Sequence, residues 1–258
     1  MDAIELFSEG GHRNILLPEF DAGEGVSSNQ HVIVVGGEAM ILDPGGSKLY
    51  ARVFGALGSA KKGAALKYVF LSHQDPDIVA AINGWMMTTD AEALCSKLWH
   101  RFIPHFGSDR MVFARMRPIP DAGQRITLGG SELYILPAHF LHSVGNFHVY
   151  DPTAKILYSG DLGASLGQTG REVEDFDSHL PFMTGFHRRY MCSNRALRAW
   201  VRMARTLDIQ ILAPQHGALF RGPALVGRFL DWCEGLECGI DVMEDIYQVP
   251  SGQITDVA

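Results

Sequence analysis

Several features that mark other classes of protein are missing from this sequence. Its four cysteines form no CxxC pair and show no zinc-ribbon spacing, which speaks against a disulfide framework and against a thiolate zinc site. The first ten residues, MDAIELFSEG, lack the basic and apolar regions of a secretory signal. No apolar run reaches the ~18 residues of a membrane span. We therefore expect a cytoplasmic protein without a membrane segment.

Basic charge is also scarce. The 22 lysines and arginines are outnumbered by 29 aspartates and glutamates, so the formal net charge is −7. Nucleic-acid binding requires a concentrated basic surface, and we do not expect it as the main activity, although local basic patches remain open. The hydrophobic content of 47% and the absence of a low-complexity linker favour a single globular domain over residues 1–258.

Short apolar runs alternate with glycine-rich turns and with stretches of helical spacing. Residues 31–36 and 38–46 predict a β-hairpin, residues 47–60 a helix, and residues 66–73 a buried strand. The second half repeats this order. It has strand candidates at 126–139, 147–161 and 209–217, and a helix candidate at 186–207. This alternation predicts an α+β protein with two mixed sheets packed face to face and helices outside, an αββα sandwich.

Residues of the kinds that bind metals follow the strand candidates at four places, LSHQDPD, FLHSVGN, YSGDLG and LAPQHG. Loops that leave strand ends at one edge of a sandwich can converge on a shared site. The segment His73-x-Asp75-x-Asp77 has alternate spacing, which in an extended chain points three side chains to one side. The candidate ligands are His73, Asp75, Asp77, His142, Asp161 and His216.

Each candidate also has an ordinary structural interpretation. An isolated histidine at a strand end, such as His142 or His216, is more often a hydrogen-bonded structural residue than a ligand, and Asp161 beside glycine is typical of a turn. It is the order of the pieces that favours a metal site.

Together the pieces resemble the metallo-β-lactamase superfamily, whose chains carry an HxHxDH motif, a histidine in a glycine turn, a bridging aspartate and a late histidine. The resemblance covers roughly residues 29–220, and Asp43 in LDPGG resembles an early supporting aspartate of the superfamily. It implies that His73, Asp75 and His142 hold one metal, that Asp77 and His216 hold the other, and that Asp161 bridges them.

Asp75 departs from the hydrolases of the superfamily, which carry histidine there, and resembles the di-iron domain of flavodiiron proteins with its HxExDH motif. The nineteen-residue step from His142 to Asp161 is similar to that group as well. Three carboxylates and three imidazoles form a hard, anionic ligand set that suits iron, although zinc can substitute. The resemblance therefore implies two iron ions.

Ile78 stands where the family motif ends in histidine, so one ligand is missing. Either a spare histidine takes its place, or the second metal keeps three protein ligands and has a position open for water or O2. The spare histidines weighed are His12, His139, His148 and His187, each of which has an alternative role on the surface or in the core.

Only 42 residues follow His216, too few for the flavodoxin domain of flavodiiron proteins, so no FMN is expected in this chain. A stand-alone domain with an incomplete ligand set resembles the oxygen-binding di-iron proteins found beside bacterial chemoreceptors. Residues 186–197, FHRRYMCSNRAL, resemble that branch too, and they would bring His187 and Tyr190 near the site unless they form a surface helix.

Three functions follow from these patterns. The first is a di-iron protein that binds O2, for sensing or for slow reduction of O2 or NO, with an external electron donor or a chemoreceptor as partner and with a homodimeric assembly. If such a protein is an enzyme, it is an oxidoreductase. The alternative is a zinc-dependent metallohydrolase acting on an ester, thioester or lactone, which Asp75 disfavours. A binding module with a degenerate site gains support only from Ile78.

Overall fold

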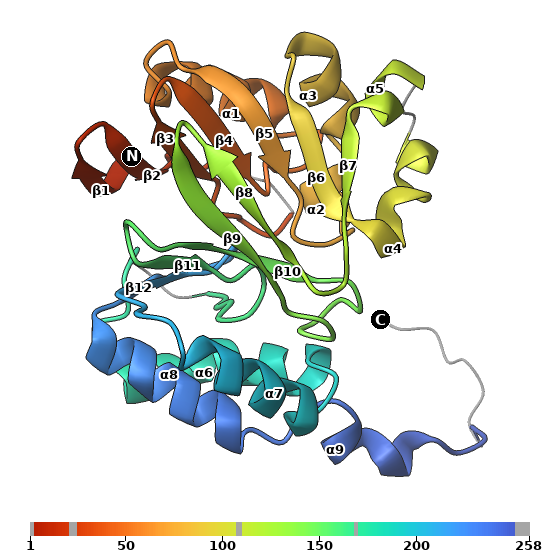
Figure 1. The fold of residues 1–258 in the computed structure, drawn as a ribbon. Helices are drawn as coiled ribbons and strands as arrows, with labels where there is room; N and C mark the ends of the chain where they lie inside the picture. Colours follow the sequence, from red (N-terminus) through yellow and green to blue (C-terminus); the bar gives the residue numbers. More distant parts are fainter. Residues whose placement is uncertain (1–2, 21–24, 107–109, 168–169, 251–258) are drawn as a thin grey trace.

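Two facing β-sheets form the centre of the protein in a computed structural model that describes residues 3–20, 25–106, 110–167 and 170–250. The first sheet has the strand order β1-β2-β3-β4-β5-β6-β7, and the second has the order β13-β12-β11-β10-β9-β8. Helices cover the outer face of each sheet (Figure 1). The prediction of an αββα sandwich is confirmed. None of the helices in the described ranges combines the length and the apolarity that spanning a membrane requires.

The first sheet is antiparallel from β1 to β4 and parallel from β4 to β7. Its strands are β1 Ile4–Glu9, β2 His12–Leu16, β3 His31–Val35, β4 Glu38–Leu42, β5 Ala65–Phe70, β6 Glu92–Ser96 and β7 Met116–Ile119. The helical segments that accompany it are α1 Tyr50–Ala60, α2 Pro76–Val79, α3 Ile82–Thr88, α4 Lys97–His100, η1 Ile103–Phe106 and α5 Arg110–Ala114.

The second sheet is antiparallel except where β11 pairs with β12. Its strands are β8 Gln124–Leu128, β9 Ser131–Pro137, β10 Phe147–Asp151, β11 Ile156–Tyr158, β12 Ile211–Ala213 and β13 Phe220–Arg221. Three long helices cover it, α6 Phe176–Tyr190, α7 Asn194–Ala204 and α8 Pro223–Gly235, and α9 Ile240–Met243 and η2 Glu244–Ile246 follow.

Three apolar layers hold the sandwich together. One lies between the first sheet and its helices, one between the two sheets, and one between the second sheet and its helices. In α1, for example, Val53, Leu57 and Ala60 are buried at helical spacing, so one stripe of the helix packs on the sheet. Burial of all three layers fixes the relative position of strands whose ends carry polar loops.

Three of the predicted elements are each divided into two in the structure. The candidates 126–139 and 147–161 are each a hairpin rather than one strand, because Gly129–Gly130 and the segment 152–155 form turns. The helix candidate 186–207 is divided into α6 and α7, since the backbone of Met191 and Ser193 is extended. A hydrogen bond from the Cys192 amide to the Phe140 carbonyl, 3.2 Å long, holds this link in place.

Two hairpin turns from opposite sheets touch at one end of the sandwich. Gly36 and Gly129 both have positive φ, and a Cβ atom on Gly129 would lie 1.9 Å from the Val35 carbonyl oxygen. Only glycine fits such a contact. β4, β5 and β9 run from this end toward the opposite end, where the predicted ligands lie.

Candidate metal site

All six predicted ligands lie close together at the other end of the sandwich. His73, Asp75 and Asp77 follow β5 of the first sheet. His142, Asp161 and His216 follow β9, β11 and β12 of the second sheet. Each of them follows a strand, as expected, and the two sheets contribute three side chains each.

Asp161 occupies the centre of the group. Its Oδ2 lies 2.8 Å from Nε2 of His142 and 3.8 Å from Nε2 of His73. Its Oδ1 lies 3.5 Å from Nε2 of His216. The two oxygens of one carboxylate therefore face two different groups of residues, which is the arrangement that a bridging ligand requires.

The other two carboxylates lie on opposite sides of Asp161. Oδ2 of Asp75 is 3.7 Å from Nε2 of His73 and 3.6 Å from Nε2 of His142. Oδ2 of Asp77 is 3.4 Å from Nε2 of His216. The set thus divides into His73, Asp75 and His142 on one side and Asp77 and His216 on the other.

The backbone of the first loop differs from the extended segment predicted from alternate spacing. His73 and Asp75 precede α2, Asp75 has the extended φ and ψ of −67° and 149°, and Pro76 begins the helix. Asp77 therefore lies in the first turn of α2. Proline at this position favours a helix start, so the third side chain reaches the site from a helix and not from a strand.

Hydrogen bonds to neighbouring residues orient the imidazoles. Nδ1 of His216 donates to the Ser27 carbonyl at 2.8 Å, and Nδ1 of His73 lies 2.9 Å from Ser72 Oγ. Asp43 accepts a bond from the Ser72 amide at 2.8 Å, consistent with the supporting role expected for this aspartate. Such contacts on one ring nitrogen leave Nε2 free to bind a metal.

A second set of contacts positions Asp75. The side-chain amide of Gln74 donates to Asp75 Oδ1 at 3.0 Å, and the Ser143 hydroxyl donates to Gln74 Oε1 at 2.5 Å. Gln74 therefore joins the loop of Asp75 to the loop of His142. The sequence gives no sign of this role, since the alternate spacing singles out His73, Asp75 and Asp77 but not Gln74.

The charge balance of the site favours a bound cation. Burial alone would raise the pKa of Asp161, but its hydrogen bond from His142 and the neighbouring histidines hold that pKa well below its usual range. Burial would lower the pKa of His216, yet Asp77 and Asp161 raise it to about 9. Asp161 Oδ1 is buried and has no hydrogen-bond partner among the described residues. Buried carboxylate oxygens and imidazole nitrogens that converge in this way form a donor set that fits bound metal ions.

Ile78 and the four spare histidines contact other parts of the protein. Ile78 is fully buried in the layer between the first sheet and its helices. The spare histidines have other partners: His12 bonds Asp151, His139 bonds the Asp121 carbonyl, and His148 accepts from Trp200. His187 donates to the Met183 carbonyl and accepts from the Gly163 amide. Among the described contacts, none of these histidines reaches Asp77 or His216.

Residues 186–190 lie beside the site. The ring of Tyr190 is 5.7 Å from that of His142, at 76°, and stacks on Phe186 at 4.7 Å. His187 is buried, and its bond to Gly163 supports the turn that carries Asp161. Tyr190 therefore approaches the site as expected, whereas His187 has a structural contact.

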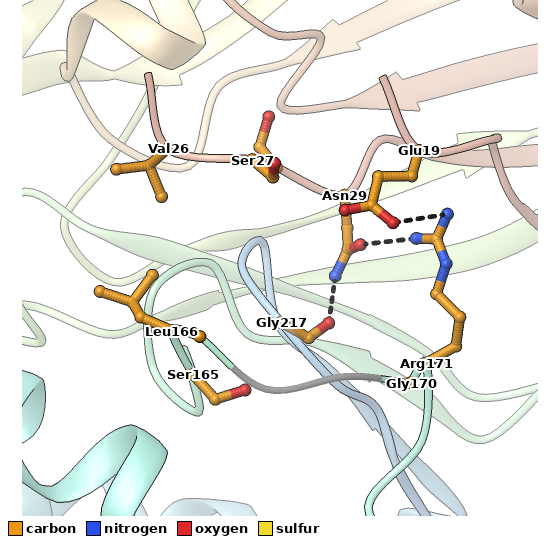
Figure 2. Close-up of a pocket in the computed structure, with 11 residues that line it drawn as sticks. Glu19, Val26, Ser27, Asn29, Ser165, Leu166, Gly170, Arg171 and Gly217 are labelled. Atoms are coloured by element: carbon orange, nitrogen blue, oxygen red, sulfur yellow. Dashed lines mark hydrogen bonds and ion pairs between the residues drawn. The ribbon is translucent and has the colours of Figure 1, made fainter. Parts of the chain in front are cut away.

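A cavity of about 640 Å³ borders the loop of His216. Figure 2 shows Arg171 directed toward Glu19 and Asn29 in its wall. Arg171 Nη1 donates to Asn29 Oδ1 at 3.3 Å, and the Asn29 amide donates to the Gly217 carbonyl at 2.8 Å. This wall is tied to the residue after His216, so it helps to place that imidazole.

Comparison with known proteins gives two kinds of match. The family model described as "ODP family beta lactamase" matches residues 26–217. One solved structure is described as a peroxy diiron species of chemotaxis sensor ODP. Its sequence is 40% identical to this one, and the match covers 96% of this chain and 100% of the ODP chain, with a TM-score of 0.86. The apo state of chemotaxis sensor ODP from T. denticola is 39% identical over 95% of this chain and 99% of its own, with a TM-score of 0.83.

More distant structures share the fold alone. Rubredoxin oxygen:oxidoreductase from Desulfovibrio gigas is 12% identical over 90% of this chain and 61% of its own, with a TM-score of 0.75. No curated protein gives a significant match to the sequence.

Proposed function

Because the chain belongs to the ODP family of β-lactamase-fold proteins, we propose that it is a non-haem di-iron protein that binds O2. The observation that carries the proposal is the position of Asp161, whose two carboxylate oxygens face separate groups of imidazoles and carboxylates. The likeness to a chemotaxis sensor in a peroxy diiron species supports O2 as the ligand.

In this proposal His73, Asp75 and His142 would hold one iron, Asp77 and His216 would hold the other, and Asp161 would be shared between them. Bound iron would supply the Lewis acidity and the electrons that O2 binding needs. Three carboxylates against three neutral imidazoles favour iron over zinc as the native metal, and zinc can replace it in purified protein. Gln74 and Ser143 hold the Asp75 carboxylate in place, and Ser27 holds the His216 imidazole with Nε2 toward the site.

Ile78 leaves the second half of the ligand set one residue short of the family motif. Its side chain cannot coordinate, so only Asp77, His216 and the shared Asp161 would hold the second iron, which would leave room for a ligand. An aliphatic side chain at this position would also offer the second iron no proton. Both properties favour holding O2 over reducing it, and we therefore place sensing ahead of slow reduction of O2 or NO.

The partners and the setting belong to the same proposal. We propose that this domain works in the cytoplasm as a homodimer, with a chemoreceptor or an external electron donor as partner. The four cysteines are all free, which suits a reducing compartment.

The test begins with protein loaded anaerobically with Fe(II). We expect two irons per chain by metal analysis and a new visible absorption band when O2 is admitted. His216→Ala should lose about half of the bound iron, whereas His139→Ala, which removes a histidine bonded to the Asp121 carbonyl, should keep both ions. A wild-type protein that binds two irons but shows no spectral change with O2 would contradict the O2 assignment.

A further inference from the structure

Helix α7 carries a row of arginines on its outer face. Arg195, Arg198 and Arg202 are exposed and follow one another at spacings of three and four, so they lie on one side of the helix. The opposite side of α7, which includes Leu197 and Val201, is buried against the second sheet and its neighbouring helices. The row is therefore fixed in position by the core beneath it.

These arginines differ from several others on the protein surface. Arg125 pairs with Glu132, Arg221 with Glu172 and Arg228 with Asp177. In the described part of the chain, no ion pair joins an acid to the row of α7, although acids outnumber bases in the sequence. Like charges at this spacing destabilise a helix, so the row lowers the stability of the free protein.

The row lines a groove of about 620 Å³, which Asn194, Ala199 and Asp241 complete. Asp241 forms no ion pair with these arginines in the described structure, and its Oδ2 accepts bonds from the backbone amides of Asn194, at 2.5 Å, and Cys238, at 3.1 Å. From the first arginine to the last, the groove follows about two turns of helix, roughly 10 Å. Arginine also binds carboxylates through two parallel hydrogen bonds, which lysine cannot do, and residues 186–207 contain no lysine.

We propose that this groove docks an acidic helical segment of a partner protein. Carboxylates at spacings of three or four on that segment would match the three guanidinium groups in order. A nucleic acid fits less well, since its phosphates continue beyond the groove and would meet a protein of net charge −7. An anionic membrane meets the same repulsion.

The groove begins close to the candidate metal site. Tyr190, in the last turn of α6, contacts the His142 ring, and the Cys192 amide is bonded to the Phe140 carbonyl in the loop of that histidine. A change in the His142 loop can therefore move the start of α7. A link between the groove and the state of the metal site depends on the proposed function. The docking of an acidic segment does not depend on it.

The test uses two fluorescein-labelled helical peptides of about 18 residues and equal composition. One carries its glutamates on a single face, and the other has them spread around the helix. We expect the single-face peptide to bind zinc-loaded and iron-loaded protein roughly ten-fold more tightly than the other, by fluorescence anisotropy. The triple variant Arg195→Gln, Arg198→Gln, Arg202→Gln should weaken its binding roughly ten-fold.

A matched triple variant, Arg125→Gln, Arg221→Gln, Arg228→Gln, removes the same charge from other faces and should bind like wild type. Equal weakening in both triple variants would overturn the proposal, because it would reflect net charge alone. Tighter binding of a DNA duplex, or of vesicles containing phosphatidylglycerol, would overturn the choice of a protein partner. Zinc-loaded protein that binds the peptide supports the groove even if iron-loaded protein fails to bind O2, so the two proposals fail separately.

Discussion

Replacing Ile78 with histidine tests whether this position reaches the second metal. Ile78 is fully buried and packs in the same apolar layer as Leu71 and Trp85, one residue after Asp77. Losing its buried aliphatic side chain should lower the free energy of unfolding by about 2 kcal/mol. A buried imidazole without a partner should lower it by roughly 1–3 kcal/mol more.

Metal should reverse this loss if the new histidine is a ligand. A metal at about 100 times its dissociation constant adds roughly 2.7 kcal/mol to the stability of a protein that binds it only when folded. A further ligand lowers that dissociation constant, so the metal should stabilise Ile78→His by more than it stabilises wild type. Without metal the variant should be less stable than wild type, by roughly 3–5 kcal/mol.

The assay is urea unfolding with EDTA and with anaerobic Fe(II), together with calorimetric titration of the metal. Ile78→Gln is the control, because it introduces a buried polar side chain that is a poor ligand. If the histidine and glutamine variants gain equally from metal, position 78 does not reach the ion, and the missing ligand does not explain an open coordination position.

Three further predictions concern the site and the core. Asp161→Ala should lose at least one metal by metal analysis and keep its circular dichroism spectrum, because the apolar layers do not depend on it; an unfolded variant would assign the aspartate a structural role. A β-lactam, a lactone and a thioester should not turn over with zinc or iron bound, and a kcat/KM near ~10⁴ M⁻¹s⁻¹ for any of them would favour the hydrolase. Burial lowers the pKa of His31 to about 4, whereas a histidine in the unfolded chain has a pKa of about 6.5. As the pH drops, the unfolded chain therefore binds a proton before the folded protein does. The free energy of unfolding should fall between about pH 6.5 and about pH 4. His31→Leu should reduce the loss between pH 7 and pH 5 by roughly 2 kcal/mol in urea unfolding, and an unchanged pH dependence would show that His31 is charged when folded.

The sequence predicted the elements whose signals are local. The apolar run before His73 identified β5, and the paired glycines after Val35 identified the β3–β4 hairpin. The candidate ligands were recognisable because each follows a strand, and their order along the chain linked them to one family. Both signals are carried by neighbouring residues.

Features that depend on distant contacts were beyond prediction. Gln74 bonds Ser143, 69 residues away, and no spacing in the sequence indicates that pair. The division between α6 and α7 has no glycine or proline to mark it, and depends on Cys192 meeting the loop of His142. The expectation of an extended His73–Asp77 segment failed because Pro76 begins a helix at once.

The contact between the turns of Gly36 and Gly129 links the separation of the two sheets at one end of the sandwich to their separation at the other end. The turns join the sheets at one end, and the candidate ligands lie at the other, one strand length or roughly 20 Å away. A methyl group at Gly129 would force the turns apart and tilt one sheet against the other, which changes the spacing between the ligands that each sheet carries. We therefore expect Gly129→Ala to change metal affinity if it overcomes the packing of the two sheets, although Gly129 touches no ligand.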